Sequence, residues 1–168
     1  MSDETSLHGL AVTAIEIARQ KGCRIVTAES CTSGALSTLL SDIPGAGEVL
    51  EGGFVSYSKS FKNDVLGVGA SILEAETAVS GAVAHAMADG ALRLCATAEI
   101  AIAVTGVCGP KPDDDGNPVG LAYLVVTNRN GDLKRKKLKL LPEASGRVRG
   151  TMIGEALELL ASFLAEQN

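Results

Sequence analysis

A run of small hydroxyl and thiol side chains follows a short apolar stretch early in the chain. Residues 25 to 34 read I-V-T-A-E-S-C-T-S-G, so the candidate nucleophile Ser30 lies between a predicted strand and a predicted helix. The free N–H groups and positive end of a helix start favour an anion or an oxyanion there. The alternative is that Thr32 or Ser33 only caps the helix. The candidate site comprises Glu29, Ser30, Cys31 and Thr32.

A serine hydroxyl needs a base, and lysine is the candidate because the chain has only two histidines. With Tyr57 at the end of a predicted strand, Lys62 falls in the first turn of the next predicted helix. The helix dipole disfavours a cation there and tends to lower the pKa of the amine. Lys62 could then serve as a neutral base, as lysine does in Ser-Lys variants of the catalytic triad. The alternative is that Lys59 and Lys62 belong to a solvated helix face.

A third candidate segment, Thr105-Gly106-Val107-Cys108-Gly109-Pro110, ends an apolar stretch and leads into a loop rich in Gly, Pro and Asp that reaches Pro118. Its backbone amides and Thr105 could hold a phosphate or a ribose, while the alternative is a plain surface connection. Asp113, Asp114 and Asp115 are read as solvated acids, because three consecutive carboxylates cannot face one ion from a regular element. The sequence thus assigns no metal.

These segments are positioned by a predicted α/β fold. Apolar periodicity and turn residues predict helices over about 6–21, from 33 to before Pro44, from near Ser58, over 80–94 and over 147–165. Strands are predicted over 24–28, 53–57 and 100–104, the last being central, and over 119–127 and 132–141 as a hairpin with Asn130-Gly131 supplying positive φ angles.

Together these elements predict a three-layer α/β/α sandwich around a mixed five-stranded sheet, mostly parallel with a C-terminal antiparallel hairpin. The carboxyl ends of parallel strands share one edge of a sheet, and ligands bind outside that edge. We therefore expect residues 29–30, 57–58 and 105–106 to converge.

Bulk properties narrow the function further. The 168 residues suffice for one domain, and the net charge of −5 disfavours nucleic acid as a partner. Five basic residues crowd 134–139, which edge-strand protection explains better than a nucleic-acid patch. The N-terminus lacks a targeting pattern and no stretch is apolar enough to span a membrane, so the protein is expected to be cytoplasmic.

Motifs from Thr27 to Arg149 resemble, in order, those of the CinA C-terminal domain family. They are Thr27-Ala28-Glu29-Ser30-Cys31-Thr32-x-Gly34, Gly53-Phe54-Val55-x-Tyr57-Ser58-x-x-x-Lys62-x-x-x-Leu66-Gly67-Val68, Ala78-Val79-Ser80, Val104-Thr105-Gly106-x-x-Gly109-Pro110, Pro118-Val119-Gly120 and Val148-Arg149. In length the chain is similar to the single-domain PncC type, whose activity is deamidation of nicotinamide mononucleotide to nicotinate mononucleotide and ammonia.

The resemblance implies that Ser30 is the nucleophile, Lys62 its base, and Tyr57 and Thr105 supporting hydroxyl groups. It also implies a nucleotide substrate, no cofactor and a homo-oligomer. The expected substrate-binding residues are Glu29, Cys31, Thr32, Thr105, Gly106, Gly109 and Arg149.

Three departures from the family pattern motivate alternatives. Ser33-Gly34 replaces two glycines, the loop 111–115 is acidic and stiffer, and Ser145 stands where an arginine is usual. One alternative is a catalytically silent paralogue that binds a nucleotide or a protein. Another is an amidase for a related carboxamide without a phosphate.

Overall fold

The computed structural model describes residues 2 to 167. Its elements are, in chain order, α1 (Ser2–Lys21), β1 (Ile25–Glu29), α2 (Ala35–Ser41), the short 3-10 helix η1 (Ala46–Glu48), β2 (Leu50–Val55), α3 (Lys59–Leu66), α4 (Ala70–Glu76), α5 (Gly81–Leu94), β3 (Ile100–Gly106), β4 (Leu121–Asn128), β5 (Leu133–Lys139) and α6 (Ser145–Glu166).

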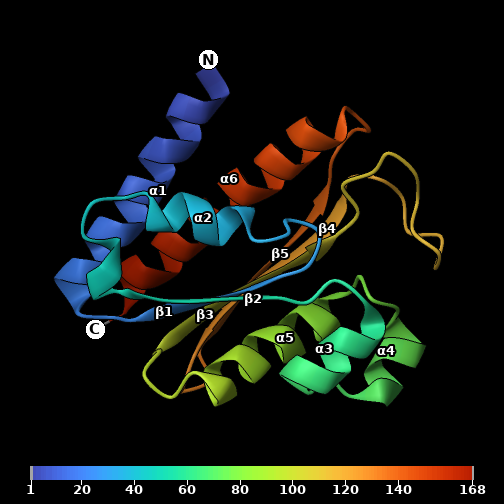
Figure 1. Cartoon of the computed structure of the whole chain (residues 1–168), viewed down its shortest axis with the longest axis horizontal. Helices are drawn as coiled ribbons and strands as arrows, with labels where there is room; N and C mark the ends of the chain where they lie inside the picture. The colour runs from blue at the N-terminus through green and yellow to red at the C-terminus, as the bar shows by residue number, and fades with distance from the viewer. Residues whose placement is uncertain (1, 168) are drawn as a thin grey trace.

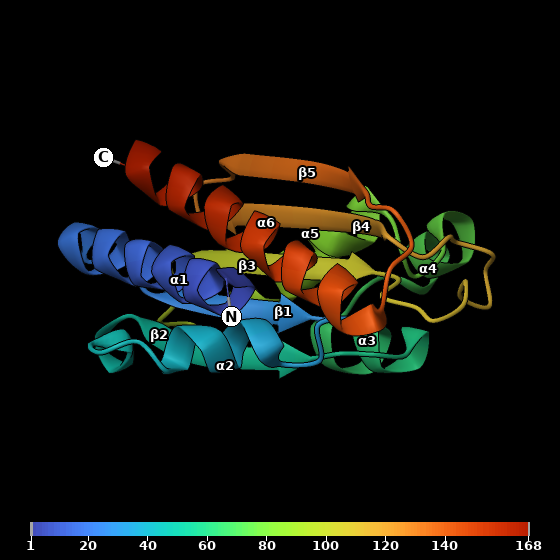
Figure 2. The same cartoon turned by 90° about the horizontal axis from the view of Figure 1, so that it is seen from above.

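One mixed sheet of five strands, in the order β2-β1-β3-β4-β5, forms the middle of the molecule (Figure 2). β1 is parallel to both β2 and β3, while β4 is antiparallel to β3 and to β5. The predicted mixed α/β sheet, its central strand β3 and its antiparallel hairpin are confirmed. Glu29 lies opposite both Val55 and Val104, so the three parallel strands bring the segments that follow them to one edge.

Helices cover both faces of the sheet, which completes the three predicted layers (Figure 1). α1, α2 and α6 lie on one face, over buried residues such as Ile25, Ile102 and Leu124. α3, α4 and α5 lie on the other, where Ala28, Ala101 and Ala103 leave room for α5 to approach closely.

Local backbone conformation shifts the predicted boundaries near the site. α2 begins at Ala35 rather than near Ser33, because Ser33 and Gly34 have φ angles of 55° and 90°, which no helix accommodates. β2 covers Leu50–Val55 instead of 53–57, because the chain leaves the sheet at Ser56 and Tyr57 and turns their carbonyl groups toward Lys62. The short helix α4 was not predicted, and Leu73 is its one buried residue.

The terminal elements differ less from the prediction. α1 is four residues longer than predicted, and α6 is three residues longer. In the hairpin, β4 is one residue shorter than predicted and β5 is three residues shorter. Only Gly131 of the predicted turn pair has a positive φ angle, because Asn128 Oδ1 accepts from the N–H groups of Asn130 and Asp132 and holds the turn itself. The basic strand β5 is an edge strand, as predicted. No helix within residues 2–167 has the length and hydropathy needed to cross a membrane.

Candidate active site at the ends of the parallel strands

Ser30 is fixed by the sheet that precedes it. Its N–H donates to Val104 O of β3 at 2.9 Å, and the neighbouring Glu29 O accepts from Ser56 N beyond β2 at 2.8 Å. Ser30 therefore extends the ladder with β3 by one residue past β1, and Ser56 extends the ladder between β1 and β2. Its side chain is buried and reaches Lys62, with 2.7 Å between Nζ and Oγ.

Lys62 is the largest of the fully buried side chains. Its ammonium donates to Ser30 Oγ and to two carbonyl oxygens, Ser56 O at 2.6 Å and Tyr57 O at 2.9 Å. No ion pair among the side chains of residues 6–167 includes it. Burial without a carboxylate penalises the charged form and lowers the pKa of Lys62 to about 8. The principal cause of the lowered pKa of Lys62 is desolvation, not the helix dipole expected from the sequence.

Glu29 is equally buried but serves the start of α2. Its carboxylate accepts from the N–H groups of Gly34, Leu36 and Ser37 at 2.8–3.1 Å, and from Ser37 Oγ at 2.8 Å. This carboxylate therefore caps the helix, whereas Thr32 Oγ1 has no partner in the described chain. The interpretation that Thr32 or Ser33 caps α2 is wrong.

Because Glu29 occupies the start of α2, the N–H groups expected there as oxyanion donors are not available. The N–H groups of Gly34, Leu36 and Ser37 point at Glu29 and are not free. Those of Cys31 and Thr32, in the turn before α2, donate to no acceptor among residues 2–167. These two amides follow Ser30 directly and are candidate backbone donors for an oxyanion.

A cavity of about 540 Å³ opens beside Ser30, a volume typical of small-molecule sites. Of the predicted site residues, its lining includes Ser30, Cys31, Tyr57, Gly106, Gly109 and Arg149. Glu29, Thr32, Lys62 and Thr105 lie behind that lining. Thr105 Oγ1 donates to Ala78 O at 2.8 Å and so holds the segment between α4 and α5 against the end of β3.

Tyr57 contributes differently from the expectation. Its side chain is 72% exposed, and its backbone carbonyl, not its hydroxyl, accepts from Lys62. Arg149 reaches across the cavity wall, where Nε donates to Cys31 O at 3.3 Å. Arg147, three-quarters exposed, pairs instead with Glu143 at 3.7 Å and does not line the cavity.

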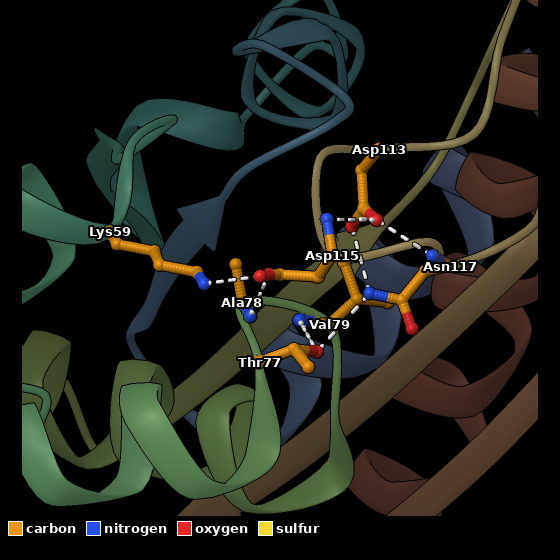
Figure 3. Close-up of polar contacts among 7 residues, drawn as sticks. All are labelled: Lys59, Thr77, Ala78, Val79, Asp113, Asp115 and Asn117. Carbon is orange, nitrogen blue, oxygen red and sulfur yellow. Dashed lines mark hydrogen bonds and ion pairs between the residues drawn. The ribbon is translucent and has the colours of Figure 1, made fainter.

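The loop between β3 and β4 forms one side of the cavity and is tied down by its own acids (Figure 3). Asp115 pairs with Lys59 of α3 at 2.6 Å and accepts from Ala78 N. Asp113 accepts from the N–H groups of Asp115 and Asn117. Asp114 and Asp115 are exposed to solvent, in line with the expectation from the sequence, and Asp113 and Asp115 also organise the loop.

Cys108, Lys59 and Lys111 line the cavity but were not singled out from the sequence. The signal for Cys108 was its place inside the Thr105–Pro110 segment. Lys59 was set aside with the solvated helix face. Ser33 is exposed and outside the lining, so it leaves the cavity free.

The chain resembles known proteins over nearly its whole length. Residues 7–164 match the model of the CinA C-terminal domain. A CinA-like protein of Synechococcus sp. is 39% identical over 155 residues, covering 90% of this chain and 36% of that protein. A CinA-like protein of Prochlorococcus marinus is 40% identical over 130 residues, covering 77% of this chain and 29% of that protein. The chain thus spans about a third of the length of these curated relatives.

Solved structures of proteins with the same fold also match this chain. The competence/damage inducible protein CihA from Agrobacterium tumefaciens superposes with a TM-score of 0.89 at 35% identity, with 96% of each chain covered. The competence damage-inducible protein A of Klebsiella pneumoniae gives a TM-score of 0.91 at 32% identity, with 96% of this chain and 99% of that chain covered. The chain therefore belongs to the CinA C-terminal domain family.

Proposed function

We propose that this chain is an amidohydrolase that converts nicotinamide mononucleotide to nicotinate mononucleotide and ammonia with Ser30 as nucleophile and Lys62 as base. The observation that carries the proposal is the 2.7 Å contact between Lys62 Nζ and Ser30 Oγ. A fully buried lysine with neutral hydrogen-bond partners and a lowered pKa is a suitable base for a serine.

The chemistry follows from that contact. Neutral Lys62 takes the proton of Ser30 Oγ while the oxygen attacks the carboxamide carbon. The negative charge moves to the carboxamide oxygen, where the free N–H groups of Cys31 and Thr32 can stabilise it. Lys62 returns the proton to the leaving nitrogen, which departs as ammonia and leaves an acyl ester on Ser30. Lys62 then deprotonates a water molecule that attacks the ester, and returns this proton to Ser30 Oγ as the acyl group leaves as the carboxylate.

Charge around the cavity supports an anionic substrate in part. Lys59, Lys111 and Arg149 line it, but so do Asp113, Asp114 and Asp115. Lys59 is paired with Asp115, which leaves Lys111 and Arg149 as the lining cations outside any ion pair in the described chain. A 5′-phosphate would therefore be held mainly by those two side chains.

The decisive experiment is ammonia release from nicotinamide mononucleotide by the wild type and by Ser30→Ala. Removal of the nucleophile should lower the rate at least about a thousandfold without unfolding the chain. Ser33→Ala is the matched control, since Ser33 is the exposed neighbouring serine outside the cavity, and it should keep the wild-type rate. Equal turnover by wild type and Ser30→Ala would exclude the Ser30 mechanism.

A second candidate function is a paralogue that binds a nucleotide without turnover, and the acidic loop over the cavity favours it. It would be supported if the wild type released no ammonia but was stabilised against heat by the mononucleotide. A comparison of the mononucleotide with its riboside then tests whether the phosphate contributes. Preference for the riboside would indicate the amidase for a carboxamide without a phosphate.

A further inference from the structure

Three sulfur atoms from distant parts of the chain meet in the wall of the cavity. Met152 Sδ of α6 lies 3.7 Å from Cys31 Sγ, in the turn after β1, and 3.7 Å from Cys108 Sγ, in the loop after β3. The thiol of Cys108 also donates to Cys31 O at 3.4 Å. All three side chains are at most 7% exposed, and both cysteines line the cavity, so a small ion can reach them from solvent.

The ligand types at this cluster select one class of metal ion. Among the side chains of residues 6–167, no group of three or more His, Cys, Asp or Glu is suitable for a metal, so zinc and harder divalent ions lack a ligand set there. Two thiols and a thioether are soft ligands, which prefer monovalent copper. Sulfurs about 2.3 Å from a common ion lie roughly 4 Å apart in a trigonal arrangement, close to the 3.7 Å that separates Met152 Sδ from each cysteine sulfur.

We propose that Cys31, Cys108 and Met152 form a binding site for monovalent copper. Two thiolates and one Cu⁺ carry a net charge of −1, and Arg149, whose Nε lies 3.3 Å from Cys31 O, supplies the compensating charge. The ion would replace the two thiol protons, which leave to solvent, and no electron is transferred. It would then lie in the wall of the cavity that Ser30 also lines. Both thiols must lose their protons to hold the ion, so the affinity for Cu⁺ should increase with pH.

The test is an anaerobic titration of the reduced protein with Cu⁺ in competition with the chromophoric chelator bicinchoninate. The wild type should retain one copper ion per chain and show thiolate-to-copper absorption in the ultraviolet. Cys108→Ala should weaken binding about a hundredfold, and Met152→Leu, which preserves side-chain volume, about tenfold. X-ray absorption at the copper edge should show a first shell of sulfur alone.

Cys23→Ser and Cys95→Ser are the matched controls, because both are free cysteines outside the cluster and the cavity lining. They should retain copper as the wild type does. The proposal is overturned if wild type and Cys108→Ala lose copper to the chelator equally, if a control loses it, or if nitrogen or oxygen ligands dominate the copper shell. If Cys108→Ala fails to fold, Met152→Leu carries the same comparison. Copper affinity is measured without reference to catalysis, so the result is independent of the proposed amidase activity.

Discussion

Two fully buried ionisable side chains, those of Glu29 and Lys62, lie on either side of Ser30. Backbone N–H groups surround the first, and backbone carbonyl groups surround the second. The carboxylate of Glu29 accepts from three N–H groups and the Ser37 hydroxyl at the positive end of α2, and from the Thr27 hydroxyl at 3.4 Å. Lys62 donates to two carbonyl groups and to Ser30 Oγ, with no carboxylate in reach of an ion pair. Neither side chain forms an ion pair within the part of the chain that the structure describes.

This difference in hydrogen-bond partners gives Glu29 a structural role and leaves Lys62 available as a base. Glu29 has several donors for its two oxygens, so its charge is well solvated by the protein and fixes where α2 begins. Lys62 has only neutral acceptors, and the desolvation that remains lowers its pKa to about 8. The same depth of burial thus yields a helix cap in one case and a candidate base in the other.

The largest expected effect comes from replacing Lys62 with an uncharged side chain of similar length. Lys62→Met should lower the rate of ammonia release about a thousandfold, because the base is lost. The free energy of unfolding at pH 7 should change by less than about 1 kcal/mol, since the desolvation penalty and the hydrogen bonds disappear together. Steady-state kinetics and chemical denaturation measure the two quantities.

Lys59→Met is the control for this variant. Lys59 is three residues earlier on α3, but it is partly exposed and pairs with Asp115. Its loss should leave turnover at a saturating substrate concentration within a few fold of wild type. A Lys62→Met protein that retains full activity would show that Ser30 acts without this lysine.

The isosteric change at Glu29 should have the reverse pattern. Glu29→Gln places an amide donor where the N–H groups of α2 need acceptors, and should lower the free energy of unfolding by about 3 kcal/mol. Below its melting temperature the folded variant should keep most of its activity. Glu48→Gln, which weakens an exposed ion pair with Arg19, should change stability by less than about 1 kcal/mol. Equal losses for Glu29→Gln and Glu48→Gln would contradict the capping role.

The contrast between these two residues also marks what the sequence can predict. Ser30 and Tyr57 follow parallel strands, so the rule that such strand ends share an edge was enough to place both beside one cavity. Period-two alternation along β1 puts Glu29 on the face that α2 covers, a signal that was not used. Its capping role required the left-handed turn at Ser33 and Gly34 as well.

Neither the burial of Lys62 nor the proximity of the three sulfur atoms can be predicted from the sequence. A lysine in an amphipathic helix is exposed by default, and Lys62 is buried because Ser56 and Tyr57 leave the sheet early and turn their carbonyl groups inward. Cys31, Cys108 and Met152 are separated by 77 and 44 positions along the chain. Only packing of α6 across the strand ends brings them together.

The smallest effect, and the sharpest test of the comparison, is the pH dependence of turnover. Lys62 must be neutral to accept the Ser30 proton, and its pKa is about 8, so kcat/KM should rise about tenfold per pH unit below that value and level off above it. Cys108, with a pKa of about 7, titrates nearby, but the midpoint near 8 should persist in Cys108→Ala. Rates measured from pH 6 to pH 9 in both proteins decide the assignment. A midpoint that moves with the cysteine would assign the titration to the thiol, and a flat profile would mean that Lys62 is not the group that activates Ser30.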